Sequence, residues 1–195
     1  KQQRMNYGKV IVFAFTGDTF SFKFMQCWME LFNFCLDNGI KPLMSFSGEK
    51  DPYILRNLLL GGNMNYGFDQ KPFQGKLNYD YIVFIDPSVL FTINHLKTLL
   101  FHIEKHDIVS AIHPTPDMKY YNAIENIDVS EIKEHGMFRY ISREKVEELS
   151  KSEKPLLKVD YVDFHFTMFK KGVFEVIEYP WFRGSICNVI KDKQV

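Results

Sequence analysis

Two continuous apolar segments constrain the fold of this chain more than any other feature. Residues 10–15 (VIVFAF) and 81–85 (YIVFI) are rich in β-branched and aromatic side chains. They lack the alternation of apolar and polar residues that marks a strand with one face in water. This pattern is typical of central parallel strands that are covered on both faces. The sequence therefore predicts a sheet with structure packed on each side.

Helical and extended segments alternate around these two strands. A helix is predicted over residues 20–38, because its polar residues recur at spacings of three and four and form one narrow stripe, so most of its circumference should be buried. A second strand is predicted at residues 42–46. Asp51 and Pro52 then open a short helix that ends near Leu60. The order strand, helix, strand indicates parallel pairing.

The rest of the chain continues this alternation without a linker or an internal repeat. Residues 62–78 are predicted to form a loop, 92–103 a helix and 108–112 a strand. Brief helices are predicted at 128–135, 143–149 and 172–177, with extended structure over 157–169. We therefore expect one α/β domain over residues 1–195, with a mainly parallel sheet flanked by helices.

Charge, cysteine usage and hydropathy exclude several classes of protein. The chain has 24 Lys and Arg against 24 Asp and Glu, so it lacks the basic excess that sequence-independent nucleic-acid binding requires. Cys27, Cys35 and Cys187 are odd in number and have no C-x-x-C spacing, which argues against a disulfide framework and a structural zinc site. No apolar run approaches the roughly 18 residues of a membrane span. We expect a soluble cytoplasmic protein with no membrane span.

Polar residues follow both central strands, at the edge where open parallel sheets bind their ligands. Thr16, Gly17 and Asp18 form a small polar turn after the first strand, which is either a plain helix cap or part of a ligand site. Asp86 stands at the tip of the second strand, before Pro87. It either starts a turn or offers its carboxylate to a divalent cation or a sugar hydroxyl. Neither the G-x-G-x-x-G nor the G-x-x-x-x-G-K-[ST] nucleotide motif is present.

Several segments in a fixed order carry a family resemblance. They are VFAFTGDTFS at 12–21, CLDNGIKP at 35–42, QKPFQGKLNYDY at 70–81, Ile85 with Asp86, KKGV at 170–173 and YPWF at 179–182. Together they resemble the glycosyltransferases of the GT-A, Rossmann-like fold that use nucleotide-diphospho-sugars, most of all small members from bacteriophages and marine bacteria. The resemblance implies a nucleotide-binding part over about residues 9–115 and an acceptor-side part over about 116–195. For a viral member it also implies the host cytoplasm.

The resemblance implies a metal site that this sequence keeps only in part. In the family, the mid-chain strand runs into a D-x-D motif whose two carboxylates bridge Mn2+ or Mg2+ to the donor diphosphate. The first and third positions of that motif fall on Asp86 and Ser88. Ser88 offers a hydroxyl without charge, so metal binding should be weaker than with two carboxylates.

Further polar residues are candidates through their own chemistry. In an extended segment Asp163 and His165 share one face. There they complete a metal site with Asp86, act as base and orienting partner, or form the polar face of an edge strand. Lys71 and Lys76 flank the predicted loop and either bind a diphosphate or are ordinary solvated lysines.

Two functions follow as expectations. The first is transfer of a sugar from a nucleotide-diphospho-sugar donor to a hydroxyl of a glycan, lipid or protein acceptor. The alternative is a non-catalytic module of the same fold that binds a nucleotide-sugar, a glycan or a protein. The candidate residues have three roles: donor binding (Thr16, Gly17, Asp18, Lys71, Lys76, Asp86 and Ser88), catalysis (Asp163 and His165) and metal binding (Asp86 and His165).

Overall fold

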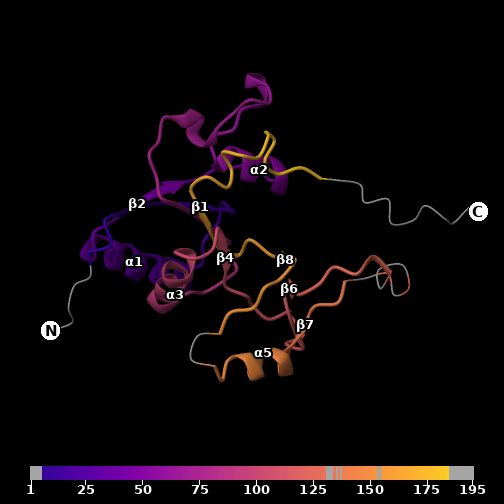
Figure 1. The fold of residues 1–195 in the computed structure, drawn as a ribbon. Coiled ribbons are helices and arrows are strands. Elements are labelled where there is room, and N and C mark those ends of the chain that lie inside the picture. Colours follow the sequence, from indigo (N-terminus) through magenta and orange to yellow (C-terminus); the bar gives the residue numbers. More distant parts are fainter. Residues whose placement is uncertain (1–5, 131–133, 135, 137, 153–154, 185–195) are drawn as a thin grey trace, which may run out of the picture. The chain divides into compact units, whose positions relative to one another are not determined.

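A five-stranded sheet is the framework of the chain. The computed structural model describes residues 6–130, 134, 136, 138–152 and 155–184. The strands lie in the order β2 (Ile40–Ser45), β1 (Lys9–Phe15), β3 (Tyr81–Ile85), β9 (Phe166–Lys170) and β4 (Ile108–Ser110). β1 pairs in parallel with β2, which lies beside it in Figure 1, and with β3, whereas β9 is antiparallel to β3 and β4. The predicted mixed α/β class with a mainly parallel sheet is confirmed.

Both faces of this sheet are covered, as predicted for its central strands. On one face, α1 (Phe22–Asp37) packs against alternate residues of β1, including Phe13, and α3 (Ile93–Ile103) packs beside α1 against β9 and β4. On the other face, α2 (Pro52–Leu59) and the segment 173–182 pack against Ala14 and its neighbours. Successive strand residues point to opposite faces, so a strand buried on both sides must be apolar throughout.

Local signals set the helix ends. The Ser21 hydroxyl accepts a hydrogen bond from the N–H of Phe24 at the start of α1, and the Asp51 carboxylate accepts from the N–H of Ile54 at the start of α2. After α1, Gly39 has a φ of 69°, and a Cβ there would lie 2.0 Å from the side-chain oxygen of Asn6. Only glycine fits this helix end.

The prediction that α1 is buried over most of its circumference is wrong. The helix buries one side, formed by Phe24, Trp28, Leu31 and Cys35. A helix that lies on a sheet presents only part of its surface to it, so apolar residues on the outer side stay accessible. The polar stripe is therefore not the only exposed part of α1.

Two further expectations differ from the structure. Residues 172–177 form turns instead of a helix, because Gly172 has a φ of 107° and its N–H donates to the carboxylate of Glu175 (2.8 Å). The extended segment at 157–169 forms two strands, β8 (Tyr161–Val162) and β9. β9 lies inside the sheet between β3 and β4, where it is almost wholly buried.

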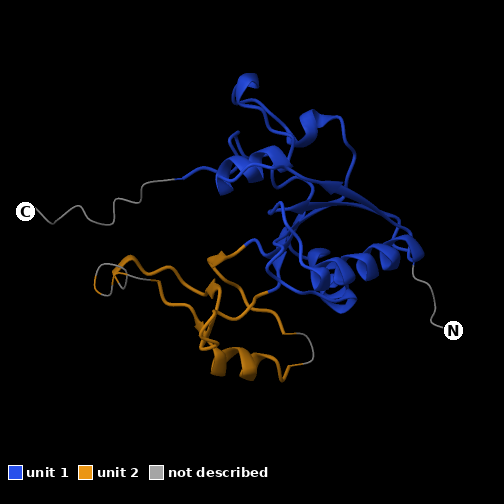
Figure 2. Cartoon of the chain, turned by 180° about the vertical axis from the view of Figure 1, so that it is seen from behind, with its two compact units in different colours: residues 1–111, 164–184 blue, residues 112–163, 185–195 orange. Residues whose placement is uncertain are grey.

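The chain divides into two compact units (Figure 2). Unit 1 comprises residues 1–111 and 164–184 and contains the sheet; unit 2 comprises residues 112–163 and 185–195. In unit 2, β5 (Tyr120–Tyr121) pairs with β7 (Ile141–Ser142), and β6 (Ala123–Ile124) pairs with β8. Its helix α5 (Arg143–Leu149) begins after the cap Ser142, as predicted. The brief helix predicted at 128–135 falls partly outside the described residues.

Within the described ranges, no helix is long and apolar enough to cross a membrane.

Candidate functional site

The strand order reverses at β1. From β1 the chain passes through α1 to β2 on one side, and then through α2 to β3 on the other side of β1. Ligands of open α/β sheets bind outside the carboxyl ends of the strands at such a reversal. The residues that follow β1 and β3 therefore form the candidate site of unit 1.

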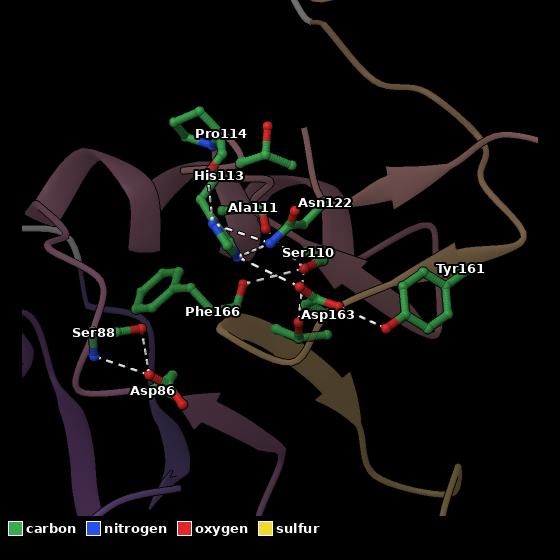
Figure 3. Close-up of polar contacts among 12 residues, drawn as sticks. Asp86, Ser88, Ser110, Ala111, His113, Pro114, Asn122, Tyr161, Asp163 and Phe166 are labelled. Atoms are coloured by element: carbon green, nitrogen blue, oxygen red, sulfur yellow. Dashed lines mark hydrogen bonds and ion pairs between the residues drawn. The ribbon is translucent and has the colours of Figure 1, made fainter. Parts of the chain in front are cut away.

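Asp86, the first residue after β3, is fixed by hydrogen bonds on every polar group. Its N–H donates to the carbonyl of His165 (2.9 Å). Its Oδ2 accepts from the Thr16 hydroxyl (3.0 Å). Its Oδ1 accepts from both the N–H (2.9 Å) and the hydroxyl (2.5 Å) of Ser88, as Figure 3 shows. The carboxylate thus joins the end of β1 to the turn after β3. The structure brings Thr16, Asp86 and Ser88 together, as the sequence predicts.

These contacts keep Asp86 charged. Burial alone would raise the pKa of its carboxyl group, but the hydrogen bonds from Ser88 and Thr16 and the nearby charge of His165 outweigh burial and hold the pKa below its usual value. A carboxylate has about four lone-pair positions, of which three are occupied here. Within the described part of the chain, one position stays available to a ligand hydroxyl or a metal ion.

The turns after β1 and β3 are in close contact. A Cβ on Gly17 would lie 2.4 Å from Cγ of Pro87, so a side chain at position 17 would push the two turns apart. Asp18 is exposed and forms an ion pair with Lys50, which lies just before α2. The hydrogen bond and charge of Lys50 lower the pKa of Asp18. This exposed pair contributes little to stability but links two segments at the carboxyl edge.

Lys71 and Lys76 are not brought to Asp86. Phe73, between them, packs against Tyr79, two residues before β3 begins. The loop therefore leads to the amino end of β3, whereas Asp86 follows its carboxyl end. Lys71 instead lines an open pocket of about 300 Å³. The other residues lining this pocket are Tyr66, Asp69, Gln70 and Gln74.

Arg56 is a cation of unit 1 that the sequence analysis missed. Its guanidinium lies 5.3 Å from the ring centre of Phe164 and 6.0 Å from that of Phe182. Phe164 in turn stacks on Phe84, the penultimate residue of β3, at 5.9 Å. Arg56 therefore lies near the carboxyl end of β3, on the face covered by α2. The sequence hinted at Arg56 only as a basic residue within the amphipathic helix α2. It did not show that the guanidinium meets the rings of Phe164 and Phe182.

The boundary between the units separates the two predicted catalytic residues. His165 belongs to unit 1, directly before β9, and lies close enough to Asp86 for its charge to affect that carboxylate. Asp163 belongs to unit 2, where one carboxylate oxygen lies 3.6 Å from Nε2 of His113 and the other accepts from the Tyr161 hydroxyl (2.7 Å; Figure 3). No pattern in the sequence marks His113 and Asp163 as a pair.

Each unit holds residues that can bind a metal ion. In unit 1 the sequence-predicted ligands are Asp86 and His165, and the Ser88 hydroxyl donates to Asp86 and reinforces that carboxylate. In unit 2 they are His113 and Asp163. A carboxylate with an imidazole suits Mn2+ and later transition metals better than Mg2+, which prefers oxygen ligands alone.

The arrangement in unit 1 supplies a fixed negative charge beside a glycine turn, together with a partly buried cation on α2. Such a site can accept hydrogen bonds from hydroxyl groups and oppose the charge of an anion. Comparison with models of protein families and with curated proteins finds no match for this chain, so its function has to be argued from its residues.

Proposed function

We propose that this chain is a glycosyltransferase of the GT-A type, which moves a sugar from a nucleotide-diphospho-sugar to an acceptor hydroxyl. The observation that carries the proposal is the charged carboxylate of Asp86, held at the reversal of strand order by hydrogen bonds from both flanking turns. A rigid, ionised group at this place is suited to fixing a ligand in one orientation.

The donor is proposed to lie across the carboxyl ends of β1 and β3. The open lone pair of Asp86 accepts from a hydroxyl of the ribose or the sugar. The turn at Thr16, Gly17 and Asp18 lies beside it, and the absence of a side chain at Gly17 keeps the two turns in contact. Arg56 supports the diphosphate as a positive charge with planar, directional donors.

A divalent cation fits this site through one carboxylate and one imidazole. Asp86 and His165 would hold it, with Mn2+ favoured over Mg2+ by the imidazole. When bound, the ion would neutralise charge on the diphosphate leaving group. Because Ser88 replaces the second carboxylate, the ion should bind more weakly than at two acids.

The acceptor hydroxyl needs a group that can take up its proton if the reaction inverts the sugar. His165, which belongs to unit 1 like Asp86, is proposed as this base, and Asp163 is the second candidate that the sequence offers. His113 Nε2 lies 3.6 Å from the Asp163 carboxylate, and the Tyr161 hydroxyl donates to it. These neighbours orient the carboxylate, as a base requires. Glycans, lipids and proteins all present suitable hydroxyls.

A second candidate function is binding without transfer. It is favoured by Ser88, which stands where the second acid is expected and donates its hydroxyl to Asp86. In this case the chain recognises a nucleotide-sugar, a glycan or a protein and turns nothing over. The two functions share the donor site and differ only in product formation.

Incubation with a panel of UDP- and GDP-sugars, with and without Mn2+, tests the proposal. Transferases slowly pass sugar to water, so release of the nucleoside diphosphate is expected without a known acceptor. Asp86→Asn should abolish this release, whereas Asp107→Asn, an exposed carboxylate before β4, should leave it intact. Binding of a nucleotide-sugar without release supports the second function, and absence of both contradicts the two proposals together.

A further inference from the structure

Residues 61–73 form a loop whose two ends are tied together; it stands at the top of Figure 1. The N–H of Phe73 donates to the carbonyl of Leu60 (2.6 Å), so the chain returns to the end of α2. Inside the loop, the Gln70 side chain accepts from the N–H of Asn63 (2.9 Å) and donates to the carbonyl of the same residue (2.8 Å). Loops with closed ends and internal side-chain bonds are compact and are frequently functional.

This loop and the turn that follows it line the pocket of about 300 Å³ described above, which we call the loop pocket. Its volume lies at the lower end of the range of small-molecule sites. The loop pocket therefore accommodates one small ring, and because it is open, a longer ligand can extend from it into solvent.

The backbone beside the loop pocket adopts a rare conformation. Phe73, Gln74 and Gly75 have φ angles of 52°, 56° and 67°, so three consecutive residues are left-handed. Residues other than glycine enter this region at a steric cost and then singly. Such strained residues cluster where a protein holds a ligand. Here the left-handed turn places the Gln74 side chain at the loop pocket.

The side chains of the loop pocket match an uncharged ligand that is rich in hydroxyl groups. Asp69 offers two carboxylate oxygens, which can accept from two neighbouring hydroxyls. Lys71 balances the charge of Asp69, so a phosphate would meet a carboxylate as well as an ammonium group. Tyr66 exposes 59% of its surface and supplies an aromatic face on which the C–H groups of a sugar ring can pack.

We propose that the loop pocket binds one sugar residue of a glycan, with the Tyr66 ring against the sugar and Asp69 and Gln74 bonded to its hydroxyls. The site is separate from the one at Asp86, because the loop leads to the amino end of β3 and Asp86 follows the carboxyl end. Sugar binding at the loop pocket needs neither a nucleotide nor a metal ion, and it does not rest on the proposed transfer reaction.

Saturation-transfer difference NMR on the whole chain, without nucleotide or metal, tests the site. The probes are the methyl glycosides of glucose, galactose, mannose, N-acetylglucosamine and rhamnose at millimolar concentrations. At least one of them should receive saturation from the protein. Tyr66→Ala removes the aromatic face and Asp69→Asn removes the charged acceptor, so each should weaken binding of that glycoside by about tenfold or more.

Two control variants separate the loop pocket from the rest of unit 1. Met64→Ala changes a 74% exposed residue in the same turn as Tyr66 that is not among the lining residues, and it should bind the glycoside like the wild type. Asp86→Asn should also bind the glycoside like the wild type, so failure of the donor site and failure of the loop pocket give different results. Circular dichroism checks that each variant is folded.

The proposal would be overturned if none of the glycosides binds, or if either Tyr66→Ala or Asp69→Asn binds like the wild type. Loss of glycoside binding in Asp86→Asn would also overturn it, by assigning the sugar to the other site. Inorganic pyrophosphate is the competing probe. If it binds, Lys71→Ala abolishes its binding and no glycoside binds, the loop pocket is an anion site instead.

Gln74→Gly tests whether the left-handed turn serves the ligand. Glycine adopts this φ without steric cost, so the melting temperature of the variant should not fall. Its affinity for the glycoside should nevertheless fall several-fold, because the side chain that bonds the sugar is gone. A Gln74→Gly variant that binds like the wild type would overturn the role of this turn in the site.

Discussion

Replacing Asp86 by Asn removes the charge from the centre of the candidate site while keeping its shape. The carboxylate accepts three hydrogen bonds, one from Thr16 and two from Ser88. A bond to a charged group contributes about 1.5–3 kcal/mol and a neutral one about 0.5–1.5 kcal/mol, so the two bonds that the Asn oxygen can still accept from Ser88 are each weakened by about 1 kcal/mol. The amide nitrogen cannot accept, so the bond from Thr16 is lost or reverses its direction. Relief from burying a charge offsets part of this loss. We expect Asp86→Asn to lower the free energy of unfolding by about 1–2 kcal/mol at pH 7.

The effect should depend on pH in one direction. The folded protein holds the pKa of Asp86 below its usual value of 3.8, so the charged carboxylate stabilises the fold above that pH. The contribution is lost as the pH falls through the lower pKa of the folded state. The difference in free energy of unfolding between wild type and Asp86→Asn should therefore be the same at pH 7 and pH 5, and it should be smaller at pH 3.

Urea unfolding followed by tryptophan fluorescence measures this difference. Both tryptophans of the chain, Trp28 and Trp181, are buried in unit 1, so the signal reports the unit that contains Asp86. Asp107→Asn serves as the control and should change stability by less than about 0.5 kcal/mol. An Asp86→Asn variant as stable as wild type at pH 7, or one whose deficit is undiminished at pH 3, would show that the charge of Asp86 does not stabilise the fold.

Two further substitutions test the packing and the metal chemistry of unit 1. Ser88→Asp replaces a donor to Asp86 with a second carboxylate, so without metal its melting temperature should be lower than that of the wild type. Mn2+ should raise the melting temperature of Ser88→Asp more than that of the wild type. An equal rise in the two proteins would count against metal binding at this site. Gly62→Ala should lower the free energy of unfolding in urea by about 1–3 kcal/mol, because its Cβ would lie 2.6 Å from the Tyr179 ring. Gly48→Ala, where the added Cβ meets open space, should change this free energy by about 0.5 kcal/mol or less. Equal effects of these two glycine substitutions would show that the contact can relax.

The central strands and helix starts could be predicted because their signals are local. Residues 10–15 must be apolar on both sides to be a buried strand, and β1 and β3 lie where that pattern places them. The caps Asp51 and Ser142 are equally local, since each side chain bonds to a backbone N–H within three residues. These caps can therefore be predicted without knowledge of any distant contact.

Features that depend on distant contacts could not be predicted. The insertion of β9 between β3 and β4 depends on pairing with residues about 60 to 90 positions earlier in the chain. The position of Lys76 likewise depends on the packing of Phe73 against Tyr79, which no pattern in the loop reveals. Met25 and Met29 look like core residues in the sequence but are exposed, because apolar periodicity alone does not show which side of a helix the sheet covers.

The candidate site was predicted in part for the same reason. The positions of Thr16 and Asp86 follow from strand ends, which the sequence marks clearly. The pairing of Asp163 with His113 requires two segments of unit 2 to meet, and the ring neighbours of Arg56 come from the far end of the chain. Such contacts are products of tertiary packing.

Calorimetric titration with UDP and GDP, each with and without Mn2+, tests whether the site at Asp86 binds a nucleotide donor. We expect at least one of these nucleotides to bind the wild type and the Asp107→Asn control. In Asp86→Asn its affinity should fall at least about tenfold, a loss of about 1.4 kcal/mol. Failure of both nucleotides to bind the wild type under either condition would contradict the account, and so would unchanged affinity in a folded Asp86→Asn variant.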